Sequence, residues 1–191
     1  GGGQYVNDLT IVTSGPTTAT FGSVSFTGAV TLTDHGADAA VLSITGGATT
    51  QAAPIVATGL ELLGSGPFTL THGGNDVDTL AADTTGAISV TDADDLSIGT
   101  VWGVPTSGIA TGDAGTDGGD VTVNAGGLLT VSQPISTAAG SGGVLSIGGG
   151  VTVNAALTLG AGDITLNGGG TACHIVINVA QTWAGDALLL A

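Results

Sequence analysis

Residues 119–166 read GDVTVNAGGLLTVSQPISTAAGSGGVLSIGGGVTVNAALTLGAGDITL, and short runs that alternate apolar and polar residues recur throughout this stretch. In residues 121–125, valine and alanine fall on one face and threonine and asparagine on the other, which is the period of a half-buried strand. A short sequence pattern that repeats with variations is typical of a solenoid, where each unit buries its apolar face against its neighbours. The alternating pattern occurs at residues 121–125, 128–131, 144–147, 151–155 and 163–166, with glycines between the runs.

The same kind of run marks the start of successive turns along the whole chain. The spacing between the openings averages about 23 residues, which lies within the range of structural repeats. No stretch sustains the 3.6-residue apolar period of a helix. We therefore predict one domain, residues 1–191, that is an all-β, right-handed parallel β-helix (β-solenoid) of roughly eight turns. The predicted openings are Tyr5, Val24, Val41, Phe68, Ile88, Val121, Val144, Ile164 and Ala187.

The alternation also predicts which side chains form the core. Apolar residues that alternate with Thr, Ser and Asn should point inward and stack on the equivalent residues of adjacent turns. With aromatics at only 3%, this core must consist of Val, Leu, Ile and Ala. The predicted core residues of the deciding stretch are Val121, Val123, Leu129, Val131, Val144, Ile147, Val151, Val153, Ile164 and Leu166.

One segment interrupts the regular spacing. Residues 101–119 read VWGVPTSGIATGDAGTDGG and hold Trp102, Pro105 and six glycines. We expect an inserted loop here that leaves the stack and returns to it. Loops on a rigid scaffold often carry binding sites, and a plain surface loop pinned by one aromatic residue is the other interpretation.

The charge composition excludes several classes of function. The chain has 15 acidic residues, no Lys and no Arg, which gives a formal net charge of −15. Nucleic acid and anionic lipid are therefore not expected partners, because both are bound through cationic side chains. No run reaches the roughly 18 apolar residues of a membrane-spanning helix. The absence of every trypsin site suits a protein exposed to proteases outside the cell.

Three segments resemble a known family: residues 74–101 (GNDVDTLAADTTGAISVTDADDLSIGTV), residues 118–136 (GGDVTVNAGGLLTVSQPIS) and residues 160–170 (GAGDITLNGGG). They are similar to the β-strand repeats of large secreted bacterial adhesins, of the filamentous-haemagglutinin-like and autotransporter-like kind. The resemblance covers roughly residues 68–170 and implies a right-handed parallel β-helix that is displayed outside the cell for adhesion, filament or matrix building. Those passengers are usually far longer and contain some basic residues.

The aspartates in residues 73–95 are the candidate metal ligands. Residues 73–80, GGNDVDTL, come close to the calcium-binding glycine–aspartate nonapeptide, although Asp76 stands where glycine is expected. Calcium takes six to eight oxygen ligands, so acids from successive turns would have to converge. Calcium is the only cofactor that the sequence suggests, and solvated turn acids are the competing interpretation. The candidate ligands are Asp76, Asp78, Asp92 and Asp94, with Asp83 and Asp95 nearby.

No catalytic residues are predicted, and the protein is not expected to be an enzyme. Polysaccharide lyases with a parallel β-helix use Arg or Lys to abstract a proton or to neutralise the substrate, and this chain has neither residue. His35, His72 and His174 are far apart in the sequence, and the first two are expected in turns. Cys173 stands alone, so it cannot form an intramolecular disulfide and is expected in the core.

The two ends of the chain suggest how copies assemble. A β-helix ends in unpaired backbone edges, and neither end here shows a polar cap. We expect residues 187–191 to pair with the strand at residues 5–12 of the next copy, giving a homopolymer. The function predicted is a structural subunit of an extracellular filament or surface layer, with carbohydrate or the cell surface as a further contact. The alternatives are a segment of a larger adhesin passenger and a β-sandwich pilin that polymerises by donor-strand exchange. The expected interface residues are Tyr5, Val6, Leu9, Ile11, Ala187, Leu188, Leu189 and Leu190.

Overall fold

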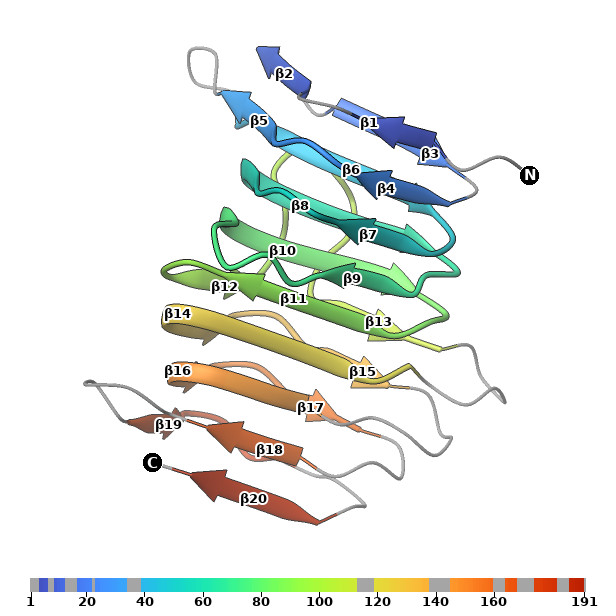
Figure 1. Cartoon of the computed structure of the whole chain (residues 1–191). Helices are drawn as coiled ribbons and strands as arrows, with labels where there is room; N and C mark the ends of the chain where they lie inside the picture. The colour runs from blue at the N-terminus through green and yellow to red at the C-terminus, as the bar shows by residue number, and fades with distance from the viewer. Residues whose placement is uncertain are drawn as a thin grey trace.

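In a computed structural model, the chain forms a stack of β-coils that rises from one end of the molecule to the other (Figure 1). Every strand pairs in parallel with the strands of neighbouring coils, and no helix occurs in the part of the chain that the structure describes. The β-solenoid expected from the sequence is confirmed, and the β-sandwich alternative is wrong because such a sandwich is built of antiparallel sheets. The structure describes residues 4–6, 9–12, 17–21, 23–33, 39–112, 119–137, 145–159, 164–167, 174–181 and 186–190.

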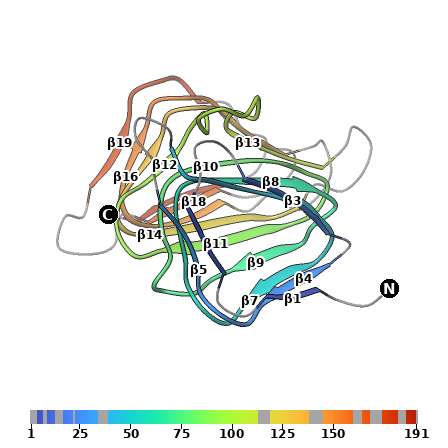
Figure 2. The same ribbon diagram turned by 90° about the horizontal axis from the view of Figure 1, so that it is seen from above.

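Each coil has three sides, so the strands form three parallel stacks, which Figure 2 shows from above. The first stack contains β1 (Gln4–Val6), β4 (Val24–Phe26), β7 (Thr49–Gln51), β9 (Phe68–Leu70), β11 (Ile88–Asp92), the start of β14 (Val121–Val131), the start of β16 (Leu145–Val153), β18 (Ile164–Asn167) and β20 (Ala187–Leu190). The second contains β2 (Leu9–Val12), β5 (Val30–Thr33), the start of β8 (Ile55–Gly64), the start of β10 (Asp76–Thr84), β12 (Leu96–Ile98), the ends of β14 and β16, and β19 (Ile175–Ile177). The third contains β3 (Thr17–Phe21), β6 (Val41–Gly46), the ends of β8 and β10, β13 (Ile109–Thr111), β15 (Ile135–Thr137) and β17 (Leu157–Thr158).

The described coils are slightly fewer than the sequence suggests. About six three-sided coils run from Val24 to Thr158, preceded by β1 to β3 and followed by β18 to β20. One predicted opening is wrong: Val41 begins β6 in the third stack, and the coil opens at Thr49 instead. β6 reads VLSITG and begins with apolar residues, whereas β7 reads TTQ and lacks the apolar residues that mark the other openings. Val144 lies outside the described residues, and its strand is described from Leu145.

The core is the set of columns formed by inward residues of successive coils. Of the ten core residues predicted for the deciding stretch, seven have 0% exposed surface, and they are Val121, Val123, Leu129, Val131, Val151, Val153 and Leu166. The register agrees, since Val123 pairs with Ile147 and Ile147 with Leu166. Leu145 in turn pairs with Ile164. The prediction of an inward apolar stack is thus confirmed wherever the side chains are described.

Glycine lets β14 and β16 turn from the first stack into the second without ending. The two strands pair on both sides of the corner, with a shift of register between Asn124 and Leu128. Gly149 has a φ of 88°, and a Cβ at this position would lie 2.1 Å from the carbonyl oxygen of Gly127. A side chain would therefore push the coils apart at this corner. The sequence predicted two runs separated by a turn, and the structure joins them into one bent strand.

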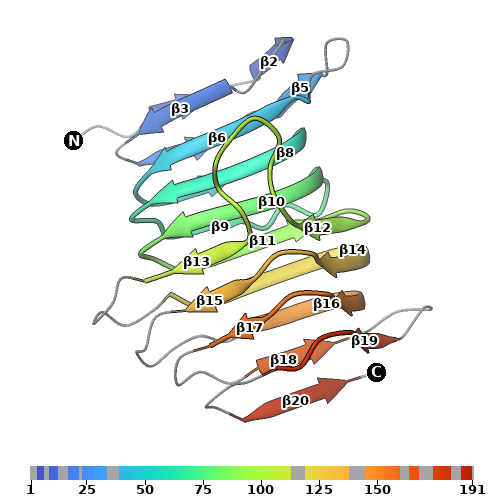
Figure 3. The ribbon, with the colours of Figure 1, turned by 180° about the vertical axis from the view of Figure 1, so that it is seen from behind.

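The inserted loop is confirmed near residue 101, but it rejoins the stack earlier than residue 119. It leaves after β12 and returns at β13, and Figure 3 shows it arching across the outer surface of β10 and β8 toward β6. Val101, which is 0% exposed, packs there against Val41 and Ala81. Residues 113–118 lie outside the described part of the chain.

Val153→Asp should prevent folding, because Val153 is 0% exposed between Val131 and Ile177 in its column. An unpaired buried carboxylate costs several kcal/mol, which is comparable with the whole stability of a small domain, about 5–15 kcal/mol. Circular dichroism and thermal melting measure the effect. The neighbouring Thr152→Asp is the matched control, since Thr152 faces outward and is only half-buried. A cooperatively folding Val153→Asp variant would contradict the strand register.

Candidate functional site

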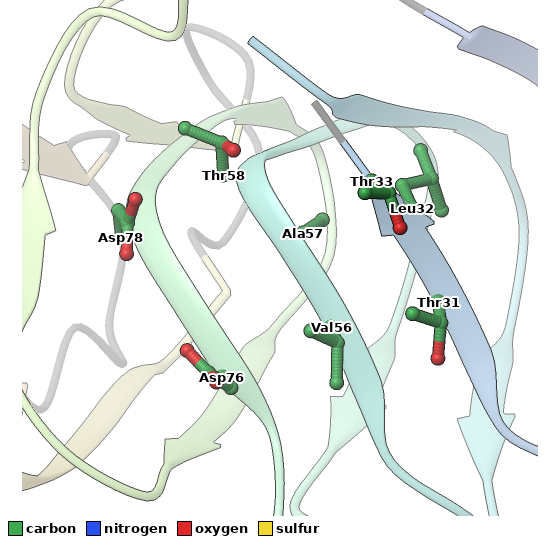
Figure 4. A pocket seen from close by; sticks show the side chains of 8 residues that line it. All are labelled: Thr31, Leu32, Thr33, Val56, Ala57, Thr58, Asp76 and Asp78. Atoms are coloured by element: carbon green, nitrogen blue, oxygen red, sulfur yellow. The ribbon is translucent and has the colours of Figure 1, made fainter. Parts of the chain in front are cut away.

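Asp76 and Asp78 lie on the outer surface of the second stack, at the start of β10. Both are exposed, and they point to one side because they are two residues apart in a strand. Figure 4 shows them beside the outward residues of β8 and β5. The three strands enclose a shallow groove of about 390 Å³, lined by Thr31, Leu32, Thr33, Val56, Ala57, Thr58, Asp76 and Asp78. This groove offers the carboxylate oxygens of Asp76 and Asp78, and carboxylates are among the ligands that calcium prefers.

Asp92 is placed elsewhere, in the corner between the first and second stacks. Its side chain is only 2% exposed. The backbone N–H of Val77 donates to Asp92 Oδ1 at 2.9 Å, and the N–H of Asp94 donates to Oδ2 at 3.2 Å. Burial raises the pKa of Asp92 from 3.8 to about 6, and the nearby Asp94 adds to this increase, while the two backbone hydrogen bonds oppose it. Through its hydrogen bond with Val77, Asp92 connects two successive coils at this corner.

The four predicted metal ligands do not form one cluster. Asp76 and Asp78 line the groove, whereas Asp92 is turned into the corner and Asp94 is exposed beside it. Asp95 accepts the N–H of Leu128, and Asp83 lies on the third stack. Within the described ranges, no group of three His, Cys, Asp or Glu side chains is arranged to hold a metal ion. Calcium binding stays a prediction that rests on Asp76 and Asp78.

Asn75 is a structural residue that the sequence analysis missed. It is 2% exposed and lies directly before β10. Its Oδ1 accepts the N–H of Ile55 at 2.9 Å and the side-chain N–H of Gln51 at 2.8 Å, and its Nδ2 donates to the carbonyl of Thr91 at 2.8 Å. The side chain thus connects three successive coils. No local signal distinguishes this asparagine from an ordinary turn residue.

Glu61 is a second residue that the sequence did not single out. It is the only glutamate of the chain and is 3% exposed on the outer side of β8, beneath the inserted loop. The hydroxyls of Ser43 and of Thr106 donate to its two carboxylate oxygens. Because Thr106 belongs to the loop, the carboxylate fastens the loop to the third stack. This pairing joins residues 45 positions apart, which no local pattern can reveal.

Two further features lie along this loop. A second shallow groove, of about 360 Å³, is lined by Ala82, Asp83, Pro105, Thr106, Ser107 and Ala110. Trp102 is 47% exposed. The loop is stiffened by a bridge between Thr100 and Ser107, whose hydroxyls lie 2.7 Å apart.

The described histidines are not part of a common site. His72 precedes a turn, as predicted, and its Nδ1 accepts the N–H of Gly74 at 3.0 Å. His174 is exposed at the start of β19, while His35 and Cys173 lie outside the described residues. The prediction that the chain is not an enzyme stays a prediction.

The predicted assembly residues lie at opposite ends of the stack. Tyr5 and Val6 are in β1, which pairs with β4, and Leu9 and Ile11 are in β2, which pairs with β5. The other four residues form β20, which pairs along one edge with β18. Leu189 of this strand is 48% exposed.

Comparison of the chain with protein-family models, with curated proteins and with solved structures found no match. In the described residues there is no helix long and apolar enough to cross a membrane.

Asp92→Asn should flatten the pH dependence of stability. A carboxyl whose pKa in the folded protein is about 6, above its ordinary value of 3.8, contributes most below pH 4, and this contribution is lost as the pH rises through 6. The unfolding free energy of the variant, measured relative to that of the wild type, should therefore increase by on the order of 2 kcal/mol between pH 4 and pH 7.5. Thermal melting from pH 4 to 8 measures this. Asp120→Asn removes the same charge from an exposed position and should keep the wild-type slope. Equal slopes in all three proteins would contradict the burial effect.

Calcium should raise the melting temperature if Asp76 and Asp78 bind it, since a ligand of the native state stabilises that state. Melting in millimolar calcium is compared with melting in chelator, for the wild type and for Asp76→Asn/Asp78→Asn. The double variant should lose the gain, while Asp83→Asn/Asp120→Asn, which removes the same charge, should keep it. A gain that sodium reproduces at equal ionic strength would leave only screening.

Proposed function

We propose that this protein is a structural subunit of an extracellular filament or surface layer, and that its copies assemble by head-to-tail stacking of the solenoid ends. The single observation that carries this proposal is the position of Leu189. It pairs in register with Leu166, which is 0% exposed, and Leu166 pairs with Ile147 in the inward column. Leu189 occupies the next level of that column and yet is 48% exposed.

A further coil would cover Leu189 as each coil covers the one before it. Burial of one leucine is worth about 1.5–3 kcal/mol, so a bare column end favours association. Exposed apolar side chains gather at this end of the molecule. Four large apolar side chains of the described residues are exposed, and three of them, Val176, Val179 and Leu189, lie in the last coils.

At the opposite end of the molecule, β1 also has one edge that pairs with no described strand. β1 pairs along one edge with β4, and β20 pairs along one edge with β18, so the two strands bound the same first stack. All the pairings in this stack are parallel, so the two bounding strands run in the same direction. Joining unlike ends of one stack continues the backbone ladder and gives an open filament rather than a closed ring.

The composition is consistent with a contact of this kind. Because the chain has no Lys and no Arg, ion pairs between these side chains and Asp or Glu cannot hold two copies together. A strand-to-strand joint needs none, since backbone hydrogen bonds and apolar stacking supply the attraction. The extracellular location rests on the resemblance to secreted adhesin repeats and on the absence of trypsin sites.

The second candidate is a segment of a larger adhesin passenger, and the same resemblance favours it. In that case the coil that covers Leu189 belongs to the same polypeptide rather than to another copy. The outward Ser and Thr residues of the first stack, such as Thr50 and Thr69, would then offer hydroxyls to carbohydrate or to the cell surface.

Leu189→Asp tests the filament. A carboxylate at the end of this column should oppose stacking, so the wild type should form unbranched filaments and the variant should remain single folded rods. Negative-stain microscopy and light scattering measure the two states. Thr50→Asp adds the same charge on an exposed residue of β7, which has a paired strand on both sides, and should leave the filaments intact. Filaments from Leu189→Asp would contradict the proposal, and monodisperse wild-type rods would favour the adhesin segment.

A further inference from the structure

We infer that the joint between copies, which rests on the head-to-tail function proposed above, is made by one stack and in one register. β20 of one copy pairs with β1 of the next, which places Leu189 level with Val6 and Leu188 level with Tyr5. The first stack then continues from copy to copy as one parallel sheet, with nine strands from each copy.

The choice of strand follows from the three-sided coil. The sequence predicted residues 5–12 as the partner of the last strand, but that range spans two sides. β1 belongs to the first stack with β20, whereas β2 pairs with β5 in the second stack. A strand can extend only the stack in which it lies, so β20 meets β1 and not β2. Leu9 and Ile11 are therefore outside the backbone ladder of this joint.

The register follows from the columns of the first stack. Val6 pairs with Phe26, which is 2% exposed, and Leu189 pairs with Leu166, which is 0% exposed. Followed coil by coil, these are two ends of the same inward column. In this register Leu189 meets Val6 at the end of this column, which is apolar except at Gln51, and the small Ala187 stands level with Gln4, which pairs with Val24.

Other registers disrupt the column. A slip of one residue would place Leu189 level with Tyr5, which pairs with the outward Ser25, and so would exchange the inner and outer faces. A slip of two residues that places Leu189 level with Gln4 would keep the inner and outer faces, but it would leave Val6 without a partner in β20, which ends at Leu190. Only the unshifted register pairs all three residues of β1 with β20 and keeps the inner and outer faces.

The number of strands in the first stack sets the axial repeat of the filament, which can be measured. Neighbouring strands lie about 4.8 Å apart, so a joint through the nine strands of the first stack gives an axial repeat of about 43 Å. Among the described strands, the second stack has eight and the third has seven, so the first stack is the longest of the three. A joint that leaves β20 and β1 unpaired must therefore give a longer repeat, because the nine strands of the first stack already fill about 43 Å.

The first measurement uses the unmodified chain, so it does not depend on the folding of a variant. Cryo-electron microscopy of the filaments should give an axial repeat of about 43 Å per copy. A repeat clearly longer than about 43 Å would show that β20 and β1 do not pair, and so would overturn the inference but leave head-to-tail assembly standing. If the unmodified chain forms no filaments, the proposed function fails, and this inference fails with it.

The second measurement tests the register by disulfide formation. Tyr5→Cys/Leu188→Cys, in a chain that also carries Cys173→Ala, places two thiols on adjacent strands of neighbouring copies. The expected Cα separation of about 4.8 Å lies within the range that a disulfide spans. Mild oxidation should give a ladder of covalent dimers, trimers and longer chains on a non-reducing gel.

The matched control moves one cysteine to another stack at the same end. Tyr5→Cys/Val176→Cys uses the exposed Val176 of β19, which lies in the second stack, and should give no ladder. Filaments whose ladder forms equally well with either pair, or only with the control pair, would overturn the register.

Discussion

The whole structure depends on one constraint: each coil must present its apolar residues at the same levels as the coil before it. A parallel ladder fixes those levels, because a residue that pairs with its neighbour in the next coil also stacks its side chain on that neighbour. The column from Ile98 through Val131 to Val153 shows this directly, since all three residues are 0% exposed. Each coil is stable only between two others, which makes the ends of the stack the natural place for association.

The corners between the stacks meet this constraint in two different ways. Near the middle of the chain, buried polar side chains tie the coils, as Asn75 does to Ile55 and Asp92 does to Val77. Farther along, glycines replace them, and the backbones approach too closely for a side chain, as at Gly149. A buried polar group is stable only when its hydrogen bonds are satisfied. The polar corners therefore specify one alignment of the coils, while the glycine corners allow close approach.

The absence of cationic side chains shapes the way in which the acids are used. A buried carboxylate has no ammonium or guanidinium partner in this chain, so it must accept hydrogen bonds from neutral donors. Glu61 accepts from two hydroxyls and Asp92 from two backbone N–H groups. Both acids fix the arrangement of neighbouring segments: Glu61 fastens the loop, and Asp92 aligns two coils at a corner. The exposed acids line grooves and corners, where water solvates them.

The sequence by itself determined the elements whose physical cause is local. Alternation within a few residues fixes which side of a strand is apolar, and so the inward positions of Val121 and Val153 and the parallel solenoid could be predicted. Only the tertiary structure decided what depends on distant residues. It showed that the coil opens at Thr49 rather than Val41, that Asp92 turns away from Asp76 into a corner, and that Glu61 meets Thr106. In each case the deciding partner lies one or more coils away, and a local pattern carries no information about the level at which two coils meet.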